Sequence, residues 1–471
     1  MFGVREAGLA AASTKLVSLL VLVGAVALGV AVVILPAKSV LVLVGSIAIS
    51  IVSLSSVEGL LLVSLVLKPL VDLTWSFGMT IGGVTVNTAR ALSVFVSVMA
   101  LYWLLGGAGR LPRNLKWWLS LFALMNGVAV FSAPSLLVGL EGFLRVMSGF
   151  ALLLIVSGSG VTLKKSVRLL RLFVVVMLFV QATVLMQPLG LIPYISHDAG
   201  LARATGFFYH PWDVARYLIV VVPVALFLRD YVVRHKPERV LMNLTLLLAL
   251  GVAYFTYLKL AWFLVVLELA IWSVWHRQYR TIGLVIVAGI AAITFGSRDA
   301  LAVMWSDFWL LFSAGPKDQA LSGRIWLWKQ YLGYMAGTAP LHLVFGQGFG
   351  ASLRSGVVLA THNDALRIML ANGALGVVGY LGVLATAFRG LWVSSAHNGD
   401  ARAGDNHIRT GLARAAFCIM VAYVLSGLTT DSSSYPSLTW YVWSLVGLAL
   451  GEAAPNPVSR SDSGVSIEAS E

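Results

Sequence analysis

Residues 361–384 have the sequence THNDALRIMLANGALGVVGYLGVL. Three polar residues, His362, Asn363 and Asp364, stand immediately before a segment that is apolar and long enough to enter a lipid bilayer. Polar groups at such a position cost free energy unless a partner or a function uses them. The stretch therefore indicates a membrane helix that begins at a functional or capping group.

The rest of the chain has the same apolar character. Its 471 residues are 59% hydrophobic and 11% charged, and its mean hydropathy is +0.89. We predict an all-α fold, a polytopic transmembrane helical bundle of about 12 to 14 spans. The lower number applies if early segments interrupted by Glu58, Lys68 and Asp72 do not cross. The candidate spans are Leu16 to Leu35, Val40 to Val57, Gly59 to Leu73, Ala89 to Leu105, Trp117 to Phe131, Ser135 to Val156, Val167 to Met186, Val214 to Leu228, Val240 to Tyr257, Leu260 to Trp275, Thr281 to Phe295, Asn363 to Phe388, Thr410 to Leu428 and Leu438 to Leu450.

Residues 1–452 are expected to form a single transmembrane domain, followed by a disordered cytoplasmic tail over residues 453–471. The first apolar run follows Arg5 and Lys15 without a convincing cleavage site, which is typical of a retained signal anchor. The single cysteine, Cys418, cannot form an intrachain disulfide and says nothing about redox compartment.

The net charge of +13 does not indicate nucleic acid, because the basic residues fall in short loops beside helix ends. With the N-terminus inside, threading the spans puts every basic cluster on the cytoplasmic side. The clusters are Arg110, Arg113 and Lys116; Lys164, Lys165, Arg168 and Arg171; Arg229, Arg234, Lys236 and Arg239; Arg277 and Arg280; and Arg389, Arg402, Arg409 and Arg414.

The same threading sends two longer connections to the outer face, about residues 187–212 and 296–362. The second is rich in aromatic residues and is expected to hold interfacial helices that lie on the membrane. Its aromatic residues are Trp305, Trp309, Trp326, Trp328, Tyr331 and Tyr334.

Three cations and one imidazole gather on this outer face: Arg203, Lys259, Arg324 and His362. The positive-inside rule does not explain cations there, so an anionic partner such as phosphate is the natural expectation. The alternative is that each arginine contacts lipid headgroups or pairs with a nearby acid.

His362 has two interpretations. Asn363 can cap the helix that follows, and Asp364 complements its dipole, so the histidine can be a solvated or capping residue. A neutral imidazole near a helix start and near cations instead has a lowered pKa and can act as a general base.

Glycines support this region in two places. Gly373, Gly376, Gly379 and Gly382 recur every third residue, which favours close packing against a neighbouring helix, although glycine is also simply tolerated in membrane helices. FGQGFG over residues 345–350 lacks the strand and helix of a nucleotide-binding loop, so we interpret it as a turn that brings backbone close to the site.

Three charged residues fall inside predicted spans. Glu141 and Arg145 lie one helical turn apart and can neutralise each other. Glu268 has no partner nearby in sequence, which is the best argument for a transporter, although pairing with a base on another helix is at least as plausible. No His, Cys, Asp and Glu cluster has metal-ligand spacing, so neither a metal nor another cofactor is indicated.

The order of motifs resembles the O-antigen ligase and O-antigen polymerase superfamily. An outer arginine precedes G-x-x-x-H-P, S-G-R follows with tryptophans nearby, and H-N-x9-G-x-x-G closes the series. The residues that match are Arg203, Gly206, His210, Pro211, Ser322, Gly323, Arg324, Trp326, His362, Asn363, Gly373 and Gly376. The resemblance covers the motifs from about Leu201 to Gly382, and the helix number agrees with it over most of the chain.

This resemblance implies a membrane glycosyltransferase whose donor is a glycan on undecaprenyl pyrophosphate, with no nucleotide sugar and no metal. Arg203 and Arg324 would hold the pyrophosphate, and His362 would orient or deprotonate the acceptor hydroxyl, with inversion at the anomeric carbon. The same resemblance assigns substrate binding to Lys259, His210, Asn363, Asp213 and Arg216. Two departures, Lys259 where relatives have an arginine and Trp212 after H-P, leave donor and acceptor identity open.

The leading prediction is an O-antigen ligase of lipopolysaccharide biosynthesis that transfers the glycan to lipid A-core. An O-antigen or exopolysaccharide polymerase of the same superfamily, which would extend a lipid-linked glycan acceptor, is the close alternative. A solute transporter is the alternative from another class, but its polar groups should lie at mid-bilayer in related halves. Either enzyme would sit in the bacterial inner membrane among membrane lipids with its site facing the periplasm, and a chain-length regulator is a further candidate partner.

Overall fold

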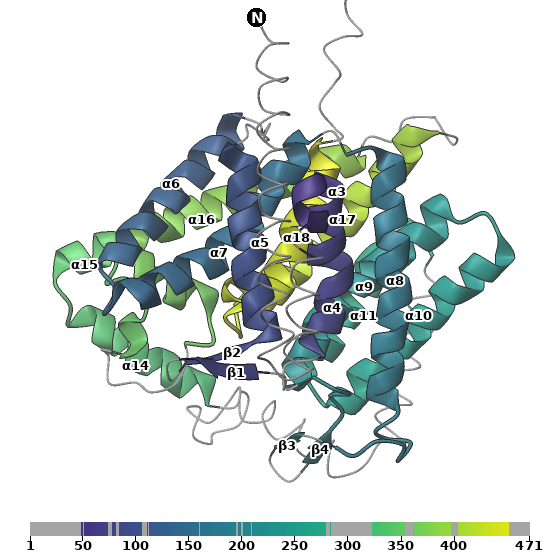
Figure 1. Cartoon of the computed structure of the whole chain (residues 1–471), viewed down its shortest axis with the longest axis horizontal. Helices are drawn as coiled ribbons and strands as arrows, with labels where there is room; N and C mark the ends of the chain where they lie inside the picture. The colour runs from purple at the N-terminus through teal and green to yellow at the C-terminus, as the bar shows by residue number, and fades with distance from the viewer. Residues whose placement is uncertain are drawn as a thin grey trace, which may run out of the picture.

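The computed structural model describes residues 49, 51–73, 78–81, 84–105, 111, 113–159, 161–194, 196–198, 201–208, 210–278, 283, 323–353, 361–396 and 404–451. The chain forms a bundle of helices (Figure 1). Its helices are α3 (Val57–Leu61), the π-helix η1 (Leu62–Leu67), α4 (Lys68–Asp72), α5 (Thr88–Leu105), α6 (Arg113–Phe131), α7 (Leu136–Gly158), α8 (Leu163–Leu185), α9 (Pro211–Phe227), the π-helix η2 (Leu228–Val232), α10 (Lys236–Thr256), α11 (Lys259–Trp275), α14 (Arg324–Ala336), α15 (Pro340–Phe345), the 3₁₀ turn η4 (Ala351–Leu353), α16 (Asp364–Ala396), α17 (Asp405–Gly427), the 3₁₀ turn η5 (Ser432–Ser434) and α18 (Pro436–Gly451).

Six of the helices in the described ranges are long and apolar enough to cross a membrane: α7, α8, α9 with η2, α10, α16 and α17. The chain is therefore a multi-pass helical membrane protein, whereas the predicted number of about 12 to 14 spans stays a prediction. The predicted spans at residues 16–35 and 281–295, most of the span at 40–57, residues 296–322 of the aromatic loop and the tail after 452 lie outside the described residues.

Two short antiparallel hairpins add strands that the all-α prediction did not include. β1 (Gly78–Ile81) pairs with β2 (Val84–Asn87), and β3 (Ser196–Asp198) pairs with β4 (Leu201–Arg203). Each hairpin has a two-residue connection that contains glycine, and such connections favour tight hairpin turns. The strands were missed because they are only three or four residues long.

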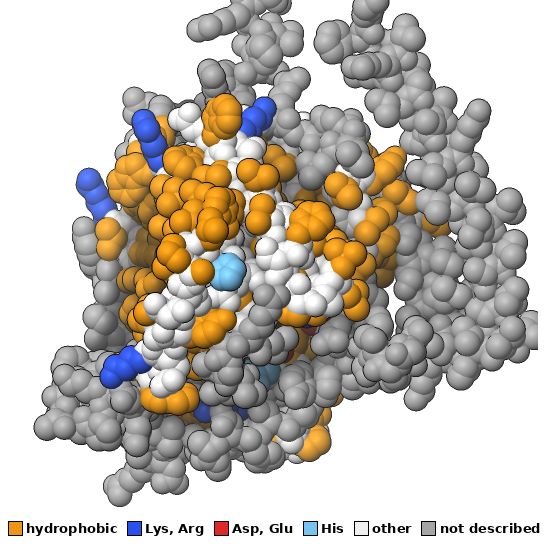
Figure 2. Space-filling view, turned by 90° about the vertical axis from the view of Figure 1, so that its left-hand side faces the viewer, with side chains coloured by type: hydrophobic (Ala, Val, Ile, Leu, Met, Phe, Trp, Pro, Cys, Tyr) orange, Lys and Arg blue, Asp and Glu red, His pale blue; other side chains and the backbone are white. Residues whose placement is uncertain are grey.

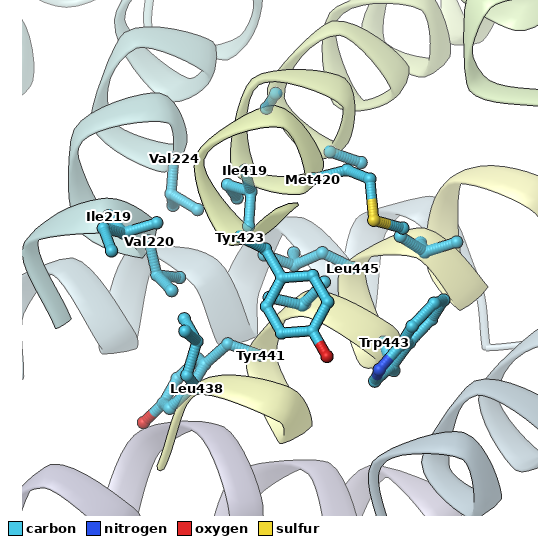
Figure 3. Close-up of a cluster of buried hydrophobic side chains, with 14 of the residues drawn as sticks. Ile219, Val220, Val224, Ile419, Met420, Tyr423, Leu438, Tyr441, Trp443 and Leu445 are labelled. Atoms are coloured by element: carbon cyan, nitrogen blue, oxygen red, sulfur yellow. The ribbon is translucent and has the colours of Figure 1, made fainter. Parts of the chain in front are cut away.

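The centre of the bundle is formed by α9, α17 and α18 (Figure 3). Every side chain from Val214 to Leu228 is buried, and so is every side chain from Ser437 to Leu450. Their sequences are apolar on all sides, which is the property of a helix surrounded by other helices. Tyr441 and Trp443 fill the space between these helices and α7 or α8.

An apolar surface surrounds this core. Figure 2 shows one side of the bundle, where hydrophobic side chains gather and Lys and Arg side chains lie near the upper and lower edges. A hydrophobic band between charged edges is the surface expected of a protein in a bilayer. Exposed apolar residues on α6, α15 and α16 include Leu124, Leu341, Val378 and Leu381.

The helices alternate in direction, so their connections divide between two ends. One end holds both hairpins and α14 (Figure 1), together with the starts of α7, α9, α11, α16 and α18. We call this the site end. The starts of α6, α8, α10 and α17, with their basic residues, lie at the opposite end. The separation matches the threading that the charges predict.

α16 departs from the continuous span predicted from Asn363 to Phe388. Gly373 has φ +68, which interrupts the helix and separates a short first segment from a long second one. Beyond the break, the packed glycine face is confirmed. A Cβ on Gly379 would lie 3.0 Å from the backbone N of Phe122 on α6, and one on Gly382 would lie 2.2 Å from the Trp118 ring.

Candidate functional site

The first turn of α16 is fixed by its own side chains. The Asn363 Oδ1 accepts a hydrogen bond from the Leu366 N–H at 3.0 Å, which confirms the predicted cap, and its Nδ2 donates to the Leu428 carbonyl at 3.0 Å. Asp364 is buried, and it accepts hydrogen bonds from the Ser433 N–H and hydroxyl. Both residues thus tie α16 to the connection between α17 and α18.

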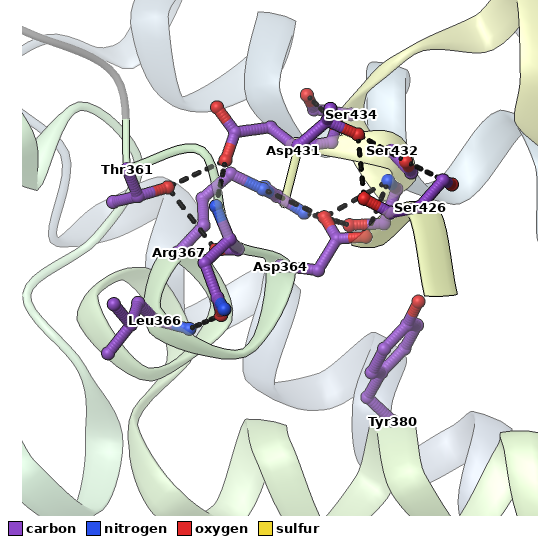
Figure 4. Close-up of polar contacts among 12 residues, drawn as sticks. Thr361, Asp364, Leu366, Arg367, Tyr380, Ser426, Asp431, Ser432 and Ser434 are labelled. Carbon is purple, nitrogen blue, oxygen red and sulfur yellow. Dashed lines mark hydrogen bonds and ion pairs between the residues drawn. The ribbon is translucent and has the colours of Figure 1, made fainter. Parts of the chain in front are cut away.

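Asp431 in that connection binds the residues on both sides of His362, and Figure 4 shows its contact with Thr361. Its Oδ1 accepts from the Thr361 hydroxyl at 2.6 Å and from the Asn363 N–H at 3.1 Å. His362 between them has φ +47, a left-handed conformation that costs free energy for a residue with a side chain. Asp431 therefore maintains a strained backbone at the histidine.

The environment of His362 lowers its pKa below the ordinary histidine value, in the predicted direction. Burial of the imidazole is the largest cause, and the positive charge of Arg324 acts in the same sense, whereas the Asp431 carboxylate opposes both. The neutral imidazole, which can accept a proton, therefore predominates at neutral pH.

Arg324 reaches this position because α14 packs on the first segment of α16. Leu327 and Tyr331 are buried against Leu370, and the Trp328 Nε1 donates to the Thr361 carbonyl at 3.2 Å. Arg324 is the first residue of α14 and follows Gly323, whose φ of +78 turns the chain into the helix.

The glycine-rich turn at residues 346–350 brings backbone to the site, as predicted. The break at Gly373 frees carbonyls of α16, and the turn supplies donors: the Gln347 N–H binds the Leu370 oxygen at 2.8 Å and the Gly348 N–H binds the Ala371 oxygen at 3.0 Å. Gly346 has φ +85, and a Cβ there would lie 2.2 Å from the Ala371 oxygen. Only glycine permits this approach.

A pocket of about 250 Å³ lies between α7, this turn, the first segment of α16 and the connection before α18. The ion pair of Glu141 with Arg145, predicted from their spacing, is confirmed and lines the pocket. The other lining residues are Val138, Gly142, Val146, Gly348, Phe349, Gly350, Ala351, Ser352, Thr361, Arg367, Leu370, Ala371, Asp431 and Ser434. Asp431 thus belongs to both the pocket and the surroundings of His362.

A second polar cluster joins α9 to its neighbours. Arg216 binds Asp213 at 2.6 Å and lies over the Tyr435 ring with its guanidinium carbon 3.4 Å from the centroid. His210 caps α9 through its Nδ1, which accepts from the Trp212 N–H at 3.1 Å. Three of the residues expected to bind substrate therefore also organise the start of α9.

Two further residues of that cluster come from α4. Lys68 and Asp72 form an ion pair, and the Tyr217 hydroxyl of α9 donates to Asp72. In the sequence Lys68 and Asp72 stand out only as interruptions of a span, whereas in the structure they are partners of α9.

Arg203 and Lys259 lie at the site end but do not line the pocket. Arg203 ends β4, and the next N–H, from Ala204, binds the Phe255 carbonyl of α10 at 3.0 Å. Lys259 begins α11 immediately after that helix. Gln187 holds the adjacent loop by accepting from the Thr205 N–H at 2.6 Å. Both cations therefore lie beside the connection between α10 and α11.

Sequence reasoning missed Asp431 and Arg367. Arg367 lies one turn after Asn363 and donates a hydrogen bond to the Ser433 hydroxyl. Its Nε lies 3.7 Å from the Asp364 Oδ1. The run TTDSSSYP over residues 429–436 was the available indication, because residues 429–435 place seven consecutive hydroxyl or carboxyl side chains between two apolar spans.

Glu268 is 1% exposed in α11, and within the described ranges neither carboxyl oxygen has a hydrogen-bond partner. The pairing with a basic residue that the sequence left open is not found there. Glu268 interacts electrostatically with Cys418 of α17.

A scan against models of known protein families finds no match to this chain, and a search of curated proteins finds no similar sequence. The resemblance to the O-antigen ligase and polymerase superfamily therefore rests on the order of the motifs alone.

Proposed function

We propose that this chain is a glycosyltransferase that moves a glycan from undecaprenyl pyrophosphate to an acceptor hydroxyl at the periplasmic face of the bacterial inner membrane. The observation that carries the proposal is the grouping of His362, Asp431 and Arg324 beside a polar pocket at the site end. The motif order supplies the donor class. The basic clusters at the opposite end support the orientation, since basic loops favour the cytoplasm.

The reaction needs a base, a nucleophile and a stabilised leaving group. The acceptor oxygen attacks the anomeric carbon as its proton passes to the neutral His362 imidazole. The bond from that carbon to the pyrophosphate oxygen breaks, and undecaprenyl pyrophosphate departs with the electron pair. Arg324 and Arg203, which the motif order assigns to the pyrophosphate, balance the charge that develops on it. A single displacement inverts the anomeric configuration. His362 supplies the base for this step, and the arginines supply the positive charge.

The preferred acceptor is lipid A-core, which makes the chain an O-antigen ligase, and a lipid-linked repeat makes it a polymerase. The test uses purified protein in lipid nanodiscs with a lipid-linked repeat, offered with and without lipid A-core. Transfer only when core is present identifies a ligase, and a ladder without core identifies a polymerase. His362→Asn should give neither product, whereas Tyr231→Phe, at the opposite end, serves as the matched control. No product from the wild-type protein under either condition contradicts the proposal.

The buried carboxyl of Glu268, which has no hydrogen-bond partner among the described residues, favours a proton-coupled transporter as the second candidate. Proteoliposomes with an imposed pH gradient separate the two candidates. Proton flux that depends on an added solute and disappears in Glu268→Gln would favour transport, and glycan transfer that survives Glu268→Gln would favour the enzyme.

A further inference from the structure

The pocket beside His362 has a balanced charge. Among the residues that the structure describes, its ionisable lining groups are the carboxylates of Glu141 and Asp431 and the guanidiniums of Arg145 and Arg367. Two negative and two positive groups surround a space of about 250 Å³. A polar pocket of this kind offers both hydrogen-bond acceptors and donors without a net attraction for an ion.

Two of the four charged groups are held in place by uncharged neighbours. Asp431 is fixed by Thr361 and Asn363, and Arg367 is fixed by Ser433. Rigid groups bind a ligand with little loss of side-chain entropy.

The Glu141 and Arg145 pair has room for a ligand. Their side chains are 50% and 44% exposed, so each retains hydrogen-bonding capacity toward the open space. A carboxylate accepts from hydroxyls and a guanidinium donates to them, and both bonds are strengthened by charge.

Apolar surface completes the pocket. Val138, Val146 and Leu370 line it, and Phe349 packs so closely against α7 that a Cβ on Gly142 would lie 2.4 Å from its ring. A pyranose has the matching surfaces, with hydroxyl groups at its rim and C–H groups on its faces. Small-molecule sites commonly combine apolar walls with a few fixed polar groups in this way.

We propose that this pocket binds a neutral sugar residue of the acceptor, next to the histidine that activates its hydroxyl. A phosphate would meet the carboxylates of Glu141 and Asp431 as well as the two guanidiniums, so the pocket offers it no net electrostatic attraction. The cations assigned to the pyrophosphate, Arg203, Lys259 and Arg324, do not line the pocket, so donor and acceptor occupy separate places. The assignment to the acceptor rests on the proposed function, whereas the binding of a neutral sugar does not.

Binding of a neutral sugar to the pocket is tested by chemical labelling, which needs no transfer assay. Ser352 lines the pocket, and the chain's only cysteine, Cys418, is buried, so Ser352→Cys gives one reactive thiol for a maleimide. The probes are inorganic pyrophosphate and the neutral and anionic oligosaccharides released by mild acid from membranes of the source cells. Ser55→Cys, an exposed position outside the pocket, is the matched control.

We expect the neutral oligosaccharides to slow labelling of Ser352→Cys but not of Ser55→Cys. Adding Glu141→Gln should weaken that protection about tenfold, through loss of a charged hydrogen bond. Glu141→Gln should also leave the pocket with an excess positive charge, so that pyrophosphate begins to protect the thiol from labelling. Absence of protection by neutral oligosaccharides, or stronger protection of the original pocket by pyrophosphate, overturns the proposal.

Transfer kinetics then separate acceptor from donor. In the transfer assay Glu141→Gln should raise KM for the acceptor about tenfold and leave KM for the lipid-linked donor unchanged. A change confined to the donor KM overturns the assignment to the acceptor. Protection by neutral sugars without any transfer would refute the proposed enzyme while sustaining a sugar-binding pocket.

Discussion

The two ends of the bundle use similar residues differently. At the opposite end, Asp230 accepts from Arg229 and from the Trp272 Nε1 at 2.8 Å. Tyr231 lies 3.0 Å from the His276 Nε2 and accepts from Arg414 at 2.7 Å. These bonds connect η2, α11 and α17, so the cluster joins helices.

At the site end, the corresponding residue types surround a pocket. Asp431 and Arg367 line it, and the neighbouring His362 has a left-handed backbone. Left-handed backbone does not by itself separate the two ends, because Arg277, which follows His276 at the opposite end, has φ +54. The comparison teaches that a histidine and its charged neighbours indicate function only when their geometry leaves space for a ligand.

The largest effect should come from His362→Asn. Asparagine tolerates a left-handed backbone better than most residues, so the variant removes the base with little added strain. We expect glycan transfer to fall by about 10² to 10⁴-fold, the usual contribution of general base catalysis. The thermal unfolding midpoint in detergent should stay near that of the wild-type protein. A transfer rate of His362→Asn within a few-fold of the wild-type rate would show that the polar cluster at the site end, like the one at the opposite end, is structural.

Gly346→Ala should cost the most stability. Its Cβ would meet the Ala371 oxygen at 2.2 Å in a residue with φ +85, and we expect a loss of about 3 kcal/mol. The midpoint of thermal unfolding measures the change. Gly337→Ala is the control, because its φ is −87 and its nearest neighbouring atom would lie 3.6 Å away. Equal midpoints in the two variants would contradict the strained turn.

In a plot of kcat/KM for glycan transfer against pH, the acid limb should move in opposite directions in Asp431→Asn and Arg324→Gln. The Asp431 charge raises the pKa of His362, so Asp431→Asn lowers that pKa and moves the limb to lower pH. The Arg324 charge lowers it, so Arg324→Gln moves the limb to higher pH. The measurement is kcat/KM across the acid range. Shifts of the same sign would show that His362 is not the titrating group.

The smallest effect is expected from Tyr231→Phe at the opposite end. It removes hydroxyl contacts with His276 and Arg414 and should lower stability by about 1 kcal/mol, with unchanged transfer. Thermal unfolding and the transfer assay together check this. A large loss of transfer with intact stability would extend the functional region to this end.

Local features were predictable from sequence. The apolar runs gave the membrane helices, Asn363 was expected to cap α16, and Glu141 was expected to pair with Arg145. The direction of the His362 pKa was also foreseen, since a helix start beside cations disfavours the imidazolium. The helices, the cap and the ion pair depend on composition or on residues within a turn or two of each other. The His362 pKa depends first on burial of the imidazole, and then on Asp431 and Arg324 from distant segments.

The composition of the site depended on contacts between distant segments. Asp431 binds Thr361 across 70 positions, and Tyr217 binds Asp72 across 145. The break at Gly373 depends on carbonyls that a turn about 25 residues earlier can satisfy.

The sequence by itself determined a membrane bundle with an unusual polar group at the start of one helix. Hydropathy and helix capping are properties of short segments, so no knowledge of neighbours was needed. Only the tertiary structure decided that Asp431 and Arg324 surround His362 and that Glu141, Arg145 and Arg367 share a pocket beside it. The physical reason is that packing between helices, rather than any local pattern, sets which polar groups meet in space.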